Sequence, residues 1–269
     1  MRKYMLSFIK SPYFYISSLL MAIFPILNIL QNWRASLSTR FDINTFDFYT
    51  NPYTTWIGID SATGYTSFLY ILLPIIVAIP CVLIYFDNKQ SGYSYFACYK
   101  LKSKRYKNLF FINSLFIGFL LPFVILIINF LSMFLIWPNF DVNYVAMDNA
   151  GRGIPTFMFP SLFFEHPFFA TIINIVLVSI YGSMFAVMSI TCSVFISKKF
   201  ICLIIPFALQ ILTGFLSAVF NSNFSWTPAQ FLDMSILALR FSPIWLFSFP
   251  IITIIIVYII YNLKGVNHE

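Results

Sequence analysis

Six cationic side chains lie close together in a polar stretch, Asp87–Asn108, that separates two long apolar runs. They are Lys89, Lys100, Lys102, Lys104, Arg105 and Lys107, and Asp87 is the one acidic residue of the stretch. Positive charge of this density between apolar runs is typical of a cytoplasmic loop in a membrane protein. Two interpretations follow. The loop only holds the topology, or it is also the place where a partner that drives the protein docks.

Residues with catalytic or metal-binding spacing are not found in this sequence. It contains no H-E-x-x-H, no G-x-S-x-G and no G-x-x-x-x-G-K-[ST] phosphate-binding loop. His166 and His268 are too far apart for a metal cluster, and the four cysteines form no C-x-x-C pair. We expect reduced cysteines that serve packing, no metal site, and no enzymatic activity or bound nucleotide in this chain itself.

The composition indicates a membrane protein. Of the 269 residues, 60% are hydrophobic and only 9% are charged, whereas soluble domains have about 25% charged residues. A bilayer crossing needs about 20 apolar residues, so the chain has room for six crossings in a single transmembrane domain, residues 1–269.

The apolar runs predict an all-α polytopic fold. The expected spans lie at about residues 12–31, 66–86, 109–137, 168–196, 200–220 and 243–263. Arg2, Lys3 and Lys10 alternate with apolar residues in the first ten positions, which predicts an amphipathic interfacial helix before the first span.

The cationic residues also predict the orientation of the chain. In this topology 12 of the 16 lysines and arginines fall on the side of both termini, and the other four fall on the opposite side. The positive-inside rule therefore places both termini in the cytoplasm and the protein in the cell membrane, as a multi-pass protein. All five tryptophans fall at or beyond the outer interface, in agreement with this orientation.

None of the expected spans contains Asp, Glu, Lys, Arg or His. This argues against a proton- or sodium-coupled secondary transporter, which usually needs ionisable groups at mid-membrane. Mildly polar residues such as Asn113 and Asn129 are expected to form interhelical hydrogen bonds, or to line a path for an amphipathic substrate. Two pairs of small residues at helical spacing, Gly182 with Ala186 and Gly214 with Ala218, are expected to allow close helix packing.

A short helix is expected just before the sixth span. Thr227 can cap its start with Pro228 at the first position, and Pro228–Leu239 mixes apolar residues such as Phe231 with polar ones such as Asp233. The segment is either a re-entrant helix at the outer face or a helix that lies on the membrane surface.

Taken together, the arrangement resembles the membrane subunit of a type-2 ATP-binding-cassette exporter. Six spans, cytoplasmic termini, an amphipathic N-terminal helix, a main inner loop after the second span and a short helical insertion before the sixth all match that family. In the family this loop has an acidic residue, a glycine, an amphipathic helix and then a basic residue. Asp87, Gly92, Tyr93–Lys100 and Lys104-Arg105 stand in those places here.

Two positions depart from the family pattern. Asn113 stands where the family often has a lysine in the third span, and the loop helix is unusually aromatic. The aromatic residues either form a knob that fits a protein cleft or lie in the inner membrane interface.

The resemblance implies a permease that exports an amphipathic peptide, bacteriocin, lipid or drug from a bacterium, with a role in immunity or resistance. It implies a separate ATPase subunit that holds ATP and Mg²⁺, and a second permease copy or a paralogue. The ATPase-docking residues would be Asp87, Gly92, Tyr95, Phe96, Tyr99, Lys104 and Arg105. An outer gate would contain Thr227, Pro228, Phe231 and Asp233.

A second class of function fits the same sequence. A non-transporting membrane protein, such as an immunity factor or an assembly subunit, would act through its outer loops, and the long loop at residues 32–65 motivates this alternative. Neither class involves nucleic acid. An ATPase partner that docks on residues 87–107 is what would distinguish the first class from the second.

Overall fold

A computed structural model describes residues 8–39, 51–59, 64–101, 103–138, 160–220, 227–234 and 243–263. In these ranges the regular structure is helical, which confirms the all-α prediction. The long helices are α2 (Pro12–Thr39), α4 (Tyr65–Gln90), α6 (Ser103–Ile136), α9 (Pro167–Phe195), α10 (Lys199–Val219) and α12 (Pro243–Leu263). The short ones are α3 (Pro52–Thr55), α5 (Tyr93–Leu101), α8 (Pro160–Glu165) and α11 (Pro228–Phe231).

Within the described ranges, six helices are long and apolar enough to cross a membrane. The chain is thus a multi-pass helical membrane protein. Three helices extend beyond their apolar runs: α2 continues to Thr39 rather than ending near residue 31, α4 continues to Gln90 rather than ending near 86, and α6 begins at Ser103 rather than near 109. None of these extensions contains a proline or glycine, so nothing in the backbone stops the helix where the apolar run ends.

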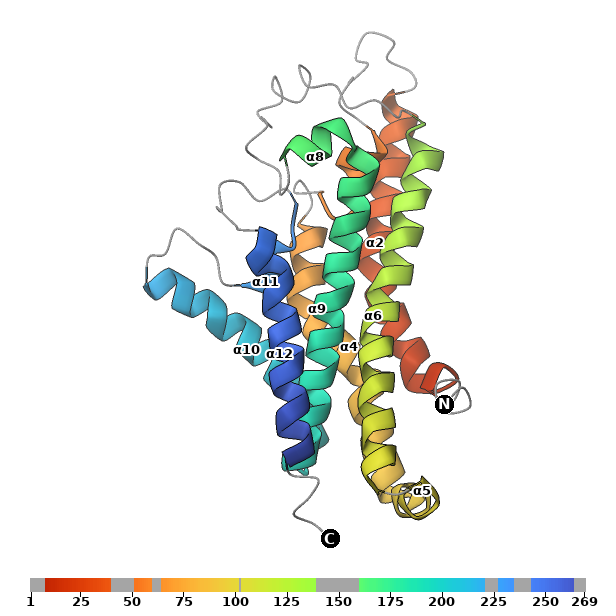
Figure 1. The fold of residues 1–269 in the computed structure, drawn as a ribbon. Coiled ribbons are helices and arrows are strands. Elements are labelled where there is room, and N and C mark those ends of the chain that lie inside the picture. Colours follow the sequence, from red (N-terminus) through yellow and green to blue (C-terminus); the bar gives the residue numbers. More distant parts are fainter. Residues whose placement is uncertain are drawn as a thin grey trace.

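Helix α9 lies at the centre of the bundle and packs against α4, α6, α10 and α12 (Figure 1). Helix α2 packs against α4 and α6 on the other side. The start of α2 and the end of α12 lie at the same end of the bundle as α5 (Figure 1). We call this the α5 end, and the other the opposite end.

The closest helix crossing joins α6 to α9 at three small residues. A Cβ atom added to Gly118 would lie 2.6 Å from the Cβ of Ala186 and 2.7 Å from the carbonyl oxygen of Gly182. Next to them, the Ser183 hydroxyl donates a hydrogen bond to the carbonyl of Leu115 at 3.0 Å. Gly182 and Ala186 therefore lie together on the face of α9 that touches the α6 backbone.

Substituting Gly182 with alanine should destabilise the bundle by about 2 kcal/mol, because the new Cβ would meet the backbone carbonyl of Gly118, which cannot rotate away. Ala218→Val adds similar bulk at an exposed position of α10 and should leave stability unchanged. Thermal unfolding of both variants in detergent measures the difference. Equal melting temperatures for Gly182→Ala and the wild type would contradict the assigned crossing.

The second pair of small residues has a different environment. A Cβ added to Gly214 would lie 2.9 Å from the Thr227 hydroxyl oxygen, so this glycine faces the segment before α12 rather than another long helix. Ala218 is exposed. Helix α10 slants away from the other long helices (Figure 1), and its buried residues, Cys202, Pro206 and Gln210, form a narrow stripe.

At the opposite end, residues 51–59 enter the bundle instead of lying on its surface. Trp56, Ile57 and Ile59 are fully buried. Asn51 begins α3 with a capping box, in which its side chain accepts a hydrogen bond from the Thr54 backbone N–H at 3.0 Å. The sequence predicted a long outer loop at residues 32–65, but neither the helix nor the burial found within it.

Asn129 holds this buried segment in place. Its Oδ1 accepts a hydrogen bond from the Ile57 backbone N–H at 3.0 Å. Its Nδ2 donates to the carbonyl of Pro25 at 3.1 Å and to Oδ1 of Asn28 at 3.2 Å. One amide of α6 therefore joins α2, α6 and residues 51–59, which agrees with the expected role of Asn129 in interhelical hydrogen bonding.

Candidate partner-docking surface and adjoining pocket

The turn that positions α5 depends on Gly92. Helix α4 ends at Gln90, and the Ser91 backbone N–H donates to the carbonyl of Asp87 at 2.9 Å. Gly92 then has a φ of 74°, in the left-handed region that is costly for residues with a Cβ. This turn sets α5 across the ends of α4 and α6 (Figure 1).

Replacing Gly92 with alanine should destabilise the protein by about 1 kcal/mol, because alanine is strained at positive φ. No atom lies within 4 Å of an added Cβ, so steric contact contributes nothing to this cost. Gly92→Asn should be milder, since asparagine adopts the left-handed region more readily. Melting temperatures that fall from the wild type to Gly92→Asn and further to Gly92→Ala would support this explanation. A Gly92→Ala variant as stable as the wild type would disprove it.

Three large aromatic side chains of α5 point away from the bundle. Tyr95 is 75% exposed, Phe96 64% and Tyr99 92%, whereas Ala97 on the packed side is 1% exposed. We call Tyr95, Phe96 and Tyr99 the aromatic patch. Among the described residues, none of these rings has an aromatic or hydrogen-bond partner. The surface they form is uncovered in the isolated chain.

Cationic side chains lie near the aromatic patch along the chain. Lys100 is in the last turn of α5, and Lys104 and Arg105 are in the first turn of α6. All three are exposed, so this end of the protein presents aromatic and positively charged groups together.

Asp87 is placed apart from the patch. Its Oδ2 accepts a hydrogen bond from the Tyr13 hydroxyl at 2.5 Å, which joins the end of α4 to the start of α2. The residues that the sequence grouped as one docking motif therefore have three positions. The aromatic patch and Lys104-Arg105 are exposed, Gly92 forms the turn, and Asp87 lies behind them.

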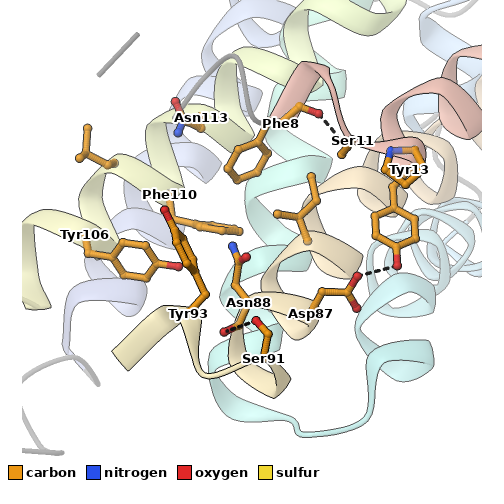
Figure 2. A pocket seen from close by; sticks show the side chains of 13 residues that line it. Phe8, Ser11, Tyr13, Asp87, Asn88, Ser91, Tyr93, Tyr106, Phe110 and Asn113 are labelled. Carbon is orange, nitrogen blue, oxygen red and sulfur yellow. Dashed lines mark hydrogen bonds between the residues drawn. The ribbon is translucent and has the colours of Figure 1, made fainter. Parts of the chain in front are cut away.

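Asp87 lines a pocket of about 480 Å³ at the α5 end, which sequence reasoning missed. Figure 2 shows side chains from the beginnings of α2 and α6 and from the region where α4 meets α5 around this space. They include Phe8, Ser11, Tyr13, Asn88, Ser91, Tyr93, Tyr106, Phe110 and Asn113. The sequence singled out Asn113 as a departure from a family pattern and as a mildly polar residue expected to form an interhelical hydrogen bond or to line a substrate path. Of the expected N-terminal helix, residues 1–7 lie outside the described ranges.

At the opposite end, the candidate gate residues lie inside the bundle. Thr227, Pro228, Phe231 and Asp233 are all buried. Phe231 contacts the ring of Tyr181 on α9, with 5.3 Å between the ring centroids. Of the two expected arrangements, the described residues fit a segment that enters the bundle better than one that lies on the membrane surface.

The gate helix is shorter than expected. It was predicted over Pro228–Leu239, but α11 ends at Phe231, and residues 235–239 lie outside the described ranges. Thr227 occupies the N-cap position without a capping hydrogen bond from its side chain. The helix stops because the next backbone groups bond elsewhere. The Leu232 carbonyl accepts from Nδ2 of Asn174 at 3.0 Å, and the Met234 N–H donates to the Gly58 carbonyl at 3.1 Å.

Comparison with known proteins adds no relative: no family model, no curated protein and no solved structure matches this chain. In the described part of the chain, no three His, Cys, Asp or Glu side chains come together in a group that could hold a metal ion. The α5 end combines exposed aromatic and cationic side chains with an adjoining pocket.

Proposed function

We propose that this chain is the permease subunit of an ATP-driven exporter in a bacterial cell membrane, and that a separate ATPase subunit docks on residues 87–107. The observation that carries the proposal is the aromatic patch on a helix set across the end of the bundle. ATP and Mg²⁺ belong to the partner, since this chain has no phosphate-binding loop.

The chemistry of α5 suits a protein partner. Large aromatic side chains are enriched among the residues that dominate binding energy at protein interfaces. Besides Tyr93, which is 42% exposed, the nine-residue helix exposes the three rings of the aromatic patch, and no described residue covers these three, so the surface is costly to leave in water. The exposed Lys100, Lys104 and Arg105 favour a partner cleft with acidic residues at its rim.

The rest of the bundle supports transport of an amphipathic substrate such as a peptide, bacteriocin, lipid or drug. The six long helices carry only mildly polar residues in their apolar spans. Helices α10 and α12 each present a wide exposed apolar face, against which a second copy or a paralogue would pack. Both termini and α5 lie in the cytoplasm in this proposal, in accord with the Lys and Arg distribution.

Purification of the chain in mild detergent from its native membrane, followed by mass spectrometry, tests the proposal. We expect a stoichiometric soluble protein that carries a phosphate-binding-loop lysine. Recovery of the chain alone, or only with other membrane proteins, would contradict the proposal.

A second candidate is a non-transporting immunity or assembly protein. The extension of α2 past its apolar run favours it, because Trp33 and Leu37 are 53% and 43% exposed there. In that case the partner would bind at the opposite end, and substitutions in the aromatic patch would leave partner recovery unchanged.

A further inference from the structure

The pocket behind α5 has two unlike walls. Figure 2 shows Tyr93, Tyr106 and Phe110 on one side and the hydrogen-bonded pair Tyr13 and Asp87 on the other. Aromatic faces attract cations through their ring electrons. The carboxylate on the opposite wall attracts cations as well, so both walls of the pocket favour a positively charged ligand.

Among the residues that the structure describes, no lysine or arginine pairs with the carboxylate of Asp87. Its hydrogen-bond partner there is the neutral Tyr13 hydroxyl. This holds although six cationic residues lie within the same loop of the sequence. Partly buried carboxylates are normally paired, so the free side of Asp87 is a place for a positively charged ligand.

Neutral polar groups complete the lining. Asn113 is only 3% exposed and borders the pocket, and its side chain forms no hydrogen bond within the described residues. Its amide can therefore donate a hydrogen bond to a ligand inside the pocket or accept one from it. Asn88 and Ser91 add further oxygen atoms to the same lining.

These features select among ligand chemistries. A phosphate or carboxylate would meet the charge of Asp87, and an acyl chain would desolvate Asp87 and Asn113 without replacing their hydrogen bonds. A primary ammonium group suits both walls, because it has three N–H donors for the oxygen atoms and a charge for the rings. A quaternary ammonium would interact with the rings but could donate no hydrogen bond.

The surroundings of the pocket indicate that the ammonium belongs to a lipid. The pocket lies where α2 begins, and the next turns of α2 expose Tyr15, Ile16 and Leu19, which are 57%, 49% and 70% exposed. Acyl chains can lie along this apolar face. Lys10 is exposed and directly precedes Ser11, which lines the pocket. Its ammonium group can therefore pair with the phosphate of the same lipid.

We propose that the pocket binds the ethanolamine headgroup of a phospholipid, with its ammonium held by Asp87 and the rings of Tyr93, Tyr106 and Phe110. The volume of about 480 Å³ lies within the usual range for small-ligand sites. This inference is independent of whether an ATPase docks on the aromatic patch.

Native mass spectrometry of the full chain in detergent tests the headgroup preference. Equal amounts of phosphatidylethanolamine, phosphatidylcholine and phosphatidylglycerol would be offered together. We expect phosphatidylethanolamine to bind about tenfold more tightly than either competitor. Its N-acetylated form, in which the headgroup nitrogen is an uncharged amide, should lose that advantage. Equal retention of all these lipids would overturn the proposal.

Paired variants locate the site. Asp87→Asn preserves the shape and should remove the preference, whereas Glu165→Gln neutralises an exposed acid at the opposite end and should not. Tyr93→Leu should weaken the preference for phosphatidylethanolamine a few-fold. Tyr99→Leu on the same helix should leave that preference unchanged, because the ring of Tyr99 is 92% exposed and lies outside the pocket. A full preference in Asp87→Asn would place the lipid elsewhere and overturn the assignment. The lipid series on the wild-type chain decides the matter even if a variant fails to fold.

Free ethanolamine and spermidine distinguish a lipid from a soluble amine. If either displaces phosphatidylethanolamine at equal concentration, the pocket recognises a soluble ammonium ligand and the lipid assignment is wrong. If only the intact lipid binds, the apolar face of α2 contributes as described.

Discussion

The triple variant Tyr95→Ala, Phe96→Ala and Tyr99→Ala should lose its ATPase partner while it still inserts and folds. Truncating an aromatic residue at the centre of an interface typically costs about 2 kcal/mol or more, and such costs are not additive. We therefore expect affinity for the partner to fall at least about 100-fold. Stability should change little, because the three side chains are 64–92% exposed and have no partners in the chain described.

Co-purification yield and the melting temperature in detergent, measured on the same preparation, check this prediction. A matched control replaces Phe169 and Trp245 with alanine, since both are large, exposed aromatic residues at the opposite end of the bundle. The control should retain the partner. A triple variant that captures an ATPase at wild-type yield would show that the aromatic patch is not the docking surface.

Replacing Asn129 with leucine should produce the largest loss of stability, about 3 kcal/mol. The substitution removes the acceptor of the Ile57 N–H and the donor to Asn28, and it leaves these groups buried without their bonds. The same change at Asn262 is the control. That side chain is half-buried, and among the described residues it bonds to the Tyr258 carbonyl of its own helix, at 3.0 Å.

Thermal unfolding in detergent measures the effect, and accessibility of residues 51–59 to labelling shows its location. We expect Asn129→Leu to melt well below the wild type and Asn262→Leu to melt close to it. If Asn129→Leu unfolds at the wild-type temperature, the buried position of residues 51–59 does not depend on this amide. Asn129→Asp should also destabilise the bundle, because the carboxylate loses the donor and places a negative charge at a buried position beside the oxygen atoms of Pro25 and Asn28.

The six long helices could be predicted from the sequence because length and apolarity suffice to identify membrane spans. Their ends could not be, because apolarity and helicity stop at different residues. Trp33 and Leu37 belong to α2 although the apolar run has ended, and Lys104 and Arg105 belong to α6 although it has not yet begun.

Residues 51–59 could not be placed from sequence. The short helix α3 was not predicted, and burial of the segment depends on Asn129, which lies 72 residues from Ile57. Nothing near residue 57 in the sequence records that partner. For the same reason α11 was predicted too long, since its end depends on Asn174 and Gly58.

The candidate site was partly accessible to sequence reasoning. A family-like pattern grouped Asp87 with Tyr95 and Tyr99, and the exposure of the two tyrosines fits their predicted role. The partner of Asp87 is Tyr13, 74 residues earlier. The pocket forms from three separate stretches of the chain, so only the folded chain shows that this acid faces a cavity rather than a docking surface.

The hydrogen bond from Met234 to Gly58 has a consequence for the order of assembly during synthesis. The ribosome delivers residues 51–59 long before residues 227–234, and domains begin to form from the N-terminus. Until α10 has been inserted, the Gly58 carbonyl has no partner from that later segment. A nascent chain arrested near residue 200 would therefore contain α2, α4, α6 and most of α9, but the hydrogen bond from Met234 to Gly58 could not yet form. Packing of residues 227–234 against the opposite end is then one of the last steps in the folding of the protein.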